Sequence, residues 1–166
     1  MVIDRSGSVY IHGAGRGDNT KLYAKNPGVP LFQIEAAEVV NFANLSLWAT
    51  QDWTPCPWPA VEGDPPCSPK DLEKPAVLMN NTSPTTLQIQ LADVYSGYLD
   101  IKGPGNVRLE STGFRTNGLM RAAVLVDHRV LKCDVVASDI AQDLAENECQ
   151  RQRHHESDQK RGPVAG

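Results

Sequence analysis

The sequence predicts an all-β fold, a parallel β-helix of about five coils. Leu99 and Ile101 alternate with Asp100 and Lys102, and this period of two indicates a short strand with one apolar and one polar face. Similar segments recur at intervals of 22 to 25 residues, and clusters of Gly, Pro and Asn separate them. A unit of this size cannot bury its inner face alone, so successive units are expected to stack and share one core.

Each coil is expected to begin with one strand and continue with a second alternating segment. The predicted first strands start at Val9, Phe32, Val77, Leu99 and Val124, and the step from Phe32 to Val77 holds one repeat plus an insertion. The apolar members of the second segments are Val40, Phe42, Leu45 and Leu47; Leu87, Ile89 and Leu91; Val107 and Leu109; and Val130, Leu131, Cys133 and Val135. A β-sandwich is the alternative fold, because short strands separated by frequent turns also fit that class.

The domain organisation follows from where this pattern holds. The β-helix is expected over 1–140, with a Trp- and Pro-rich loop insertion at 48–75. The segment 138–150 has Ser138 at a plausible N-cap and an apolar stripe with Ile140 and Leu144, which predicts a short helix that covers an open end of the stack. The polar residues 151–166 predict a disordered tail.

Charge excludes one class of partner. The chain carries a net charge of −4, and residues 151–166 carry +2, so the body carries −6. Phosphate binding needs a basic surface, so nucleic acid is not expected as a partner.

No apolar run is long enough to cross a bilayer, and residues 1–7 lack the apolar region of a signal peptide. The chain starts inside a strand pattern, from which we expect a fragment of a longer protein.

The cysteines predict a stapled loop. Cys56 and Cys67 bracket the Pro-rich insertion, and their pairing would indicate an oxidising compartment; two reduced thiols in a loop are the alternative. Cys133 lies in a strand pattern, where a buried free thiol is expected.

Two segments carry a family resemblance. The segment from Val9 to Leu22 (VYIHGAGRGDNTKL) resembles the strand, G-x-G, short turn and T-x-L of an opening coil in the pectate-lyase-like (pectin-lyase-like) right-handed β-helix superfamily. The segment from Ala123 to His128 resembles a coil strand of the same proteins. The resemblance implies right-handed coiling, polysaccharide as a ligand, and an extracellular or cell-surface location. It also implies calcium as a cofactor, whereas the residues themselves predict no cofactor and no metal site.

Stacked coils place equivalent residues in columns about 4.8 Å apart. Aligning the first strands predicts an outward column of His12, Glu35, Asn80, Lys102 and Asp127. The adjacent column would hold Tyr10, Gln33, Leu78, Asp100 and Leu125. The first column offers carboxylates and a lysine that could neutralise a uronate, so we expect it to bind a sugar chain. The alternative is a set of solvated ion pairs worth a few tenths of a kcal/mol.

Catalysis has only nominal candidates in this sequence. They are Asp100, Asp127, His128 and Lys102. Hydrolysis of a glycosidic bond needs two carboxylates at a defined separation. The chain lacks the Asn-Thr-Asp, Asp-Asp and Gly-His-Gly motifs of polygalacturonase-like hydrolases, so the sequence leaves enzymatic activity undecided.

All three tryptophans lie within the insertion. Trp48, Trp53 and Trp58 could stack on sugar rings, with the Cys56–Cys67 bridge holding the loop; the alternative is a small core inside the loop itself.

The sequence therefore predicts an extracellular carbohydrate-interacting β-helix module, part of a polysaccharide lyase or glycoside hydrolase-like protein. The alternative is a non-catalytic structural or adhesive β-helix, such as a tailspike-like or surface assembly domain that forms a homo-oligomer. Arg16-Gly17-Asp18 matches an adhesion tripeptide, but a Gly-rich coil turn accounts for it.

Overall fold

A computed structural model describes most of the chain as far as Val136. The described residues are 1–17, 19–26, 29–51, 54, 62–63, 66, 75–115, 124–127 and 129–136. Within them the regular structure is all β, with no helix.

The strands follow one another in repeating groups, each group one coil. They are β1 (Val2–Asp4), β2 (Ser8–His12) and β3 (Lys21–Tyr23); β4 (Phe32–Ala36), β5 (Val39–Ala43) and β6 (Ser46–Trp48); β7 (Pro75–Met79), β8 (Thr85–Gln90) and β9 (Asp93–Tyr95); β10 (Tyr98–Ile101), β11 (Gly105–Glu110) and β12 (Gly113–Arg115); and β13 (Val124–Val126) with β14 (Val130–Val136).

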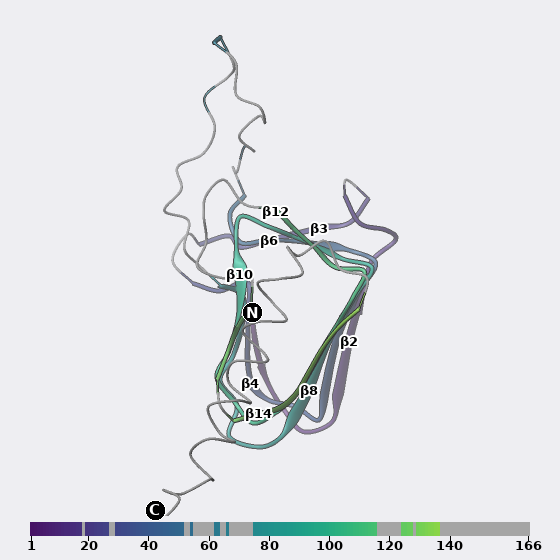
Figure 1. Cartoon of the computed structure of the whole chain (residues 1–166), viewed down its shortest axis with the longest axis vertical. Coiled ribbons are helices and arrows are strands. Elements are labelled where there is room, and N and C mark those ends of the chain that lie inside the picture. Colours follow the sequence, from purple (N-terminus) through teal and green to yellow (C-terminus); the bar gives the residue numbers. More distant parts are fainter. Residues whose placement is uncertain are drawn as a thin grey trace, which may run out of the picture.

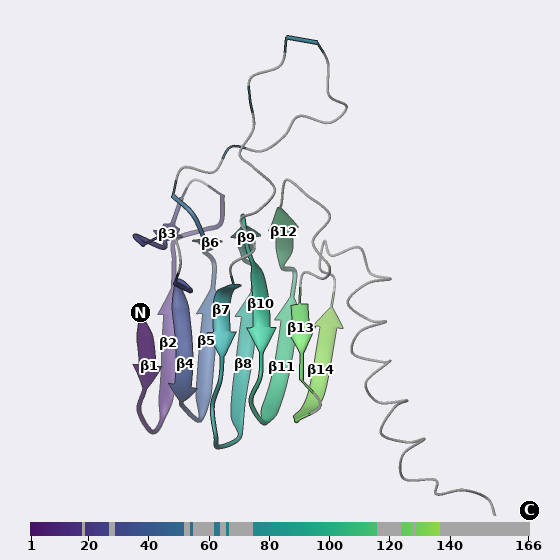
Figure 2. The ribbon, with the colours of Figure 1, turned by 90° about the vertical axis from the view of Figure 1, so that its left-hand side faces the viewer.

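Each coil adds one strand to each of three sheets. Sheet A has the order β1-β4-β7-β10-β13, sheet B the order β2-β5-β8-β11-β14, and sheet C the order β3-β6-β9-β12. Figure 1 looks along the stack, so that the sheets form its sides, and Figure 2 shows the strands of successive coils side by side. Every pair of neighbouring strands is parallel. The arrangement is compatible with a parallel β-helix, and it differs from the antiparallel sheets of a β-sandwich.

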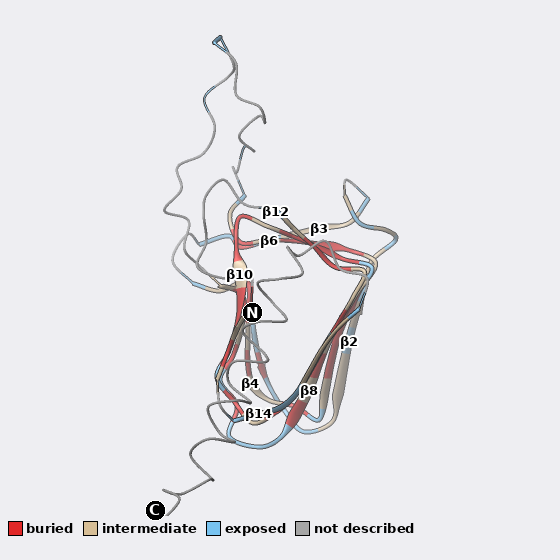
Figure 3. Ribbon diagram, viewed as in Figure 1, coloured by how far each residue is buried: buried red, intermediate tan, exposed pale blue. Residues whose placement is uncertain are grey.

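The core fills the space between the three sheets. Alternate residues of β8 and β11 are buried, which is the pattern expected where one face of a sheet is packed and the other faces solvent. In sheet B, Phe42, Ile89 and Leu109 stand in register and have no exposed surface. Phe32 of sheet A packs against Phe42, with ring centroids 4.6 Å apart. Figure 3 shows buried residues along strands on all three sides of the coil.

Single left-handed residues turn the chain from sheet B to sheet C. Asn44, Leu91 and Ser111 have φ of 55°, 48° and 48°, and each directly follows the last residue of its sheet B strand. A left-handed backbone conformation is costly for residue types other than glycine and asparagine. We expected Leu91 to continue the inward alternation of Leu87 and Ile89; it is instead 46% exposed, because the chain turns at this residue and Ala92 points inward.

A buried amide organises the turn from sheet A to sheet B. Asn81 donates from Nδ2 to Thr85 Oγ1 at 3.0 Å, to Pro104 O at 2.8 Å and to Ser83 O. Thr85 Oγ1 donates in turn to Ala37 O of the preceding coil at 2.7 Å. These bonds link the turns of three successive coils.

The first coil differs from the sequence-based alignment. Val9 and Ile11 lie in β2 and pair with Val40 and Phe42 in sheet B, so they are not aligned with Phe32 of sheet A. The strand of the first coil in sheet A is β1, whose three residues are too few to give an alternating pattern. The described strands form five such groups, in line with the prediction of about five coils.

Several predicted features lie outside the described residues. They are the helix at 138–150, the tail at 151–166, the Cys56–Cys67 pairing, Trp53, Trp58 and His128. Cys133 is half-buried and disulfide-bonded, so the expectation of a buried free thiol at this position is wrong. None of the described segments forms a helix with the length and apolar character needed to span a membrane.

Candidate functional site

Four of the five residues in the predicted column stand in register on sheet A. Glu35, Asn80, Lys102 and Asp127 directly follow Ile34, Met79, Ile101 and Val126, which are paired across the sheet. Backbone bonds continue this register, from Asn80 N to Ile34 O, from Lys102 N to Met79 O and from Asp127 N to Ile101 O. We call these four residues the sheet A column. His12 does not belong to it, because its strand, β2, lies in sheet B and pairs His12 with Ala43.

The neighbouring column on sheet A is also in register, again without its first member. Gln33, Leu78, Asp100 and Leu125 are paired from strand to strand, and Val2 takes the place that we expected for Tyr10. Asp100 is only 8% exposed.

The charged side chains of sheet A bind partners on their own strand or turn. Lys102 Nζ lies 2.7 Å from Asp100 Oδ2, and Gln33 donates from Nε2 to Glu35 Oε1 at 2.6 Å. Arg129 donates to both carboxylate oxygens of Asp127, with a distance of 3.1 Å from its Nη2 to Oδ2.

These contacts bear on the catalytic candidates. The hydrogen bond that Lys102 donates to Asp100 raises the pKa of Lys102 above its ordinary value of 10.5. A lysine with a raised pKa keeps its proton at neutral pH, and such a group cannot act as a base. Asp100 and Asp127 are each paired with a cation, Lys102 and Arg129, so the two adjacent columns of sheet A present ion pairs and not two unpaired carboxylates.

The outer face of sheet B carries a second column that the sequence alignment missed. Register places Tyr10, Asn41, Gln88, Arg108 and Asp134 on successive strands, and we call them the sheet B file. His12 Nε2 lies 2.9 Å from Asn41 Oδ1, and Asn41 donates from Nδ2 to Gln88 Oε1 at 3.1 Å. The three side chains form one hydrogen-bonded row across three coils.

Aromatic and charged groups border this row. Tyr10 is 64% exposed, and its ring meets the His12 ring edge to face at 6.3 Å. Arg108 Nη2 lies 3.0 Å from Glu110 Oε2, and the side chains of both residues are at least 40% exposed. Asn41 is only 5% exposed, so sheet B presents the half-buried amide of Gln88, an exposed phenol and an exposed guanidinium on one surface, with the Asn41 amide beneath.

Sheet C carries an aromatic ladder, defined as Tyr23, Trp48 and Tyr95. These residues are paired across β3, β6 and β9. The Trp48 and Tyr95 rings stack at 4.3 Å with an angle of 11°, and the Tyr23 ring lies 6.1 Å from Trp48. Lys21 Nζ lies 5.1 Å from the centre of the Trp48 ring.

This geometry places Trp48 apart from the sheet A column. The ladder lies near the start of the sheet A strands and the column follows their ends, so the two do not form one groove. Trp48 and Tyr95 also cover one face of each other, and a sugar ring would need such a face to stack. The arrangement favours a structural role for Trp48.

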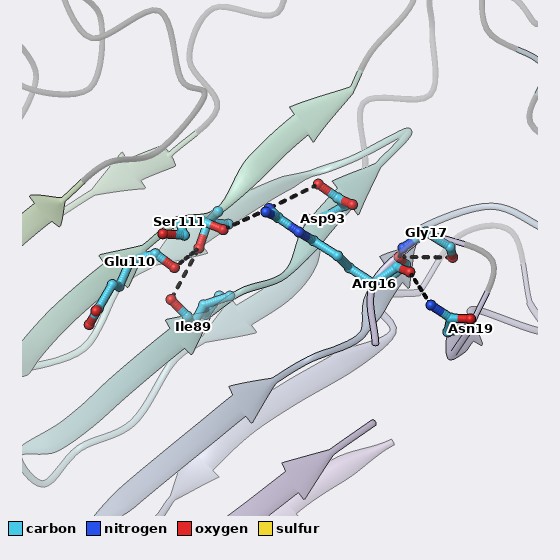
Figure 4. A network of polar contacts seen from close by, with 9 residues as sticks. Arg16, Gly17, Asn19, Ile89, Asp93, Glu110 and Ser111 are labelled. Carbon is cyan, nitrogen blue, oxygen red and sulfur yellow. Dashed lines mark hydrogen bonds and ion pairs between the residues drawn. The ribbon is translucent and has the colours of Figure 1, made fainter. Parts of the chain in front are cut away.

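A loop of the first coil reaches across the corner between sheets B and C (Figure 4). Arg16 donates from Nη1 to Ser111 O at 3.0 Å and lies 4.0 Å from Asp93 Oδ1. Gly17 N donates to Ser46 Oγ at 2.7 Å. The Arg16 side chain therefore ties the loop to later coils, which agrees with its interpretation as part of a coil turn.

Among the described residues, no carboxylate-rich cluster marks a site for the calcium ion that the resemblance implies. Calcium binds six to eight oxygen ligands, and no group of three or more His, Cys, Asp or Glu side chains gathers in the part of the chain that the structure describes.

Comparisons with known proteins add no relative. No family model, no curated protein and no solved structure matches the chain.

Proposed function

We propose that this chain is a right-handed parallel β-helix of the pectate-lyase-like kind, and that it binds carbohydrate chains on the outer face of sheet B. Right-handed coiling is supported by the strong preference of parallel strands for right-handed crossovers. The placement of the site is supported chiefly by the hydrogen-bonded row of His12, Asn41 and Gln88.

The chemistry of this row suits sugar hydroxyls. An amide side chain offers two donors and an acceptor with two lone pairs, so Asn41 and Gln88 keep hydrogen-bonding capacity beyond the bond that joins them. Their mutual bonds hold the amides in place, which lowers the entropy cost of ordering them on binding. The half-buried Gln88 lies next to the exposed Arg108 on the neighbouring strand.

The spacing also suits a polymer. Successive strands are about 4.8 Å apart, which is close to the length of one pyranose unit along a chain. A sugar chain lying along the stack would meet one member of the sheet B file at each unit. Tyr10, at the end of the file, offers an apolar ring for a terminal sugar.

Affinity electrophoresis of the whole chain against neutral and acidic polysaccharides tests this proposal. For a polysaccharide that retards the protein, we expect Gln88→Ala and Arg108→Ala each to weaken binding by about tenfold, equivalent to about 1.4 kcal/mol. The matched control is Lys102→Ala, which removes an exposed cation from sheet A.

The outcomes are separable. The proposal is supported if Gln88→Ala and Arg108→Ala bind the polysaccharide more weakly than the wild type while Lys102→Ala binds it equally well. Weakening by Lys102→Ala alone would transfer the site to the sheet A column and overturn the placement. Absence of retardation by every polysaccharide would overturn carbohydrate binding and favour the competing function, a non-catalytic structural or adhesive domain.

A further inference from the structure

The charged residues of sheet B lie on two of its strands. β2, β5 and β8, which carry the hydrogen-bonded row, contain no Asp, Glu, Lys or Arg. β11 contains Arg108 and Glu110, and β14 contains Lys132 and Asp134. With histidine counted as neutral, two cations and two acids give the strands of sheet B a net charge of zero.

Both cations are paired with an acid on their own strand. Arg108 Nη2 lies 3.0 Å from Glu110 Oε2, and Lys132 Nζ lies 2.6 Å from Asp134 Oδ2. Register also places Asp134 on the strand beside Arg108, so the guanidinium has acids in two directions. An acidic polymer needs uncompensated positive charge to offset the desolvation of its own carboxylates. These strands offer none, and the chain as a whole carries −4.

The Arg108–Glu110 pair suits neutral hydroxyl groups. The two side chains are 50% and 40% exposed, so a ligand can reach both. A guanidinium has five N–H donors and a carboxylate has about four acceptor positions, of which the bond between them uses one each. A hydroxyl group both donates and accepts. Of two neighbouring hydroxyls on a sugar ring, one can therefore accept from Arg108 while the other donates to Glu110.

Neutral amides extend this patch on the neighbouring strand. Gln88 and Gln90 stand in register with Arg108 and Glu110. Both glutamines are half-buried and alternate with the buried Leu87 and Ile89, so they face outward. The four outward side chains combine donors and acceptors without a net charge.

We propose that sheet B selects neutral carbohydrate chains over acidic ones, and that Arg108 and Glu110 together bind two neighbouring hydroxyls of one sugar unit. This inference rests on the proposed carbohydrate site and names its class of ligand. A uronate chain on the same face would meet Glu110 and Asp134 as well as Arg108 and Lys132, and it would gain no net attraction.

Affinity electrophoresis with matched forms of one polysaccharide tests this inference. Each polysaccharide that retards the full chain is compared as its neutral form, as the uronate form made by oxidation of its primary hydroxyls, and as the methyl ester of that uronate. The ester controls for loss of the primary hydroxyl, because it is neutral again. We expect the neutral form and the ester to bind, and the uronate form to bind at least about tenfold more weakly.

Glu110→Gln tests the role of the ion pair, because it keeps the size of the side chain and removes its charge. We expect it to weaken binding of the neutral form by about threefold and to strengthen binding of the uronate form by about threefold. Asp100→Asn is the matched control. It removes the acid paired with Lys102 on sheet A, so the net charge of the chain changes equally, and it should alter neither affinity.

The outcomes separate this inference from the proposed function. A wild type that binds the uronate form as tightly as the neutral form would overturn the inference and leave carbohydrate binding intact. Glu110→Gln with unchanged affinities, or Asp100→Asn with the same effect as Glu110→Gln, would overturn the role of the pair. Absence of retardation by every form would overturn the proposed function, and the inference with it.

Discussion

Gly105 shows how tightly the coils approach one another at a corner. It begins β11 with φ of +144°, and a Cβ there would lie 1.9 Å from the backbone oxygen of Thr85 in the preceding coil. Gly103, two residues earlier, packs with equal closeness against the Asn81 side chain. The turn Gly103-Pro104-Gly105 therefore needs its glycines for the stacking of turns as well as for redirecting the chain.

The first prediction concerns Gly105→Ala. We expect it to lower the free energy of unfolding by about 2 to 4 kcal/mol, because the methyl group meets backbone atoms and the φ is strained. Gly7→Ala is the control, because Gly7 also has a positive φ but its Cβ would meet nothing within 4 Å; about 1 kcal/mol is expected. Equal losses in urea denaturation would show that the coils are not in close contact at this corner.

The second prediction concerns the Lys102–Asp100 pair. The folded pKa of Lys102 is raised above 10.5 by the hydrogen bond to Asp100. Asp100→Asn should therefore lower the pKa of Lys102, as measured by NMR titration of the lysine side chain. An unchanged titration in the variant would show that the pair does not form in solution.

The sign of the stability effect follows from this direction. Because the folded pKa is raised, the pair stabilises the protein fully below the ordinary lysine pKa and loses this contribution as pH rises through the folded value. The wild type should lose slightly more stability than Asp100→Asn on alkaline titration. The effect is small, because half of the Lys102 side chain is exposed.

Among the elements, all four strands of sheet C have only three residues, and an aromatic ladder adds contacts between three of them. Strands β3, β6 and β9 have three residues each, and Trp48 stacks on Tyr95 across the last two. Stacked aromatic pairs contribute about 0.5 to 1.5 kcal/mol beyond the area that they bury. The ladder thereby links three coils on their outer side.

A double-mutant cycle with Trp48→Leu and Tyr95→Leu gives the third prediction. We expect a coupling energy of about 0.5 to 1.5 kcal/mol in the free energy of unfolding. Trp48→Leu with Tyr10→Leu is the control pair; its effects should add, because Tyr10 lies on sheet B. Additive effects in both pairs would contradict the stacking.

The central strands were predictable because their alternation is strict. Segments such as Leu99–Ile101 and Val107–Leu109 have small turns and a steady repeat, so their register follows from spacing alone. The first coil was aligned wrongly for a physical reason. Its sheet A strand is short and a longer loop follows β2, so spacing aligned Val9 with the wrong sheet.

At the scale of the whole molecule, the order of coils converts local register into long polar columns. All four members of the sheet A column were predictable, since each follows a buried apolar residue near the end of a strand; the predicted fifth residue, His12, lies in sheet B. The sheet B file was not, because Gln88 and Arg108 look like ordinary solvated residues until register places them beside Asn41. The alternation with a period of two within the second segment of each coil was the sequence signal from which the sheet B file could have been predicted.

One measurement tests carbohydrate binding on sheet B most directly: an amide NMR titration of the full chain with an oligosaccharide. The oligosaccharide is prepared from a polysaccharide that retards the protein in affinity electrophoresis. We expect shift changes at the side-chain amides of Asn41 and Gln88 and at the backbone of Tyr10 and Arg108. Residues of the sheet A column should stay unchanged. Changes confined to the sheet A column, or none at saturating ligand, would contradict the account.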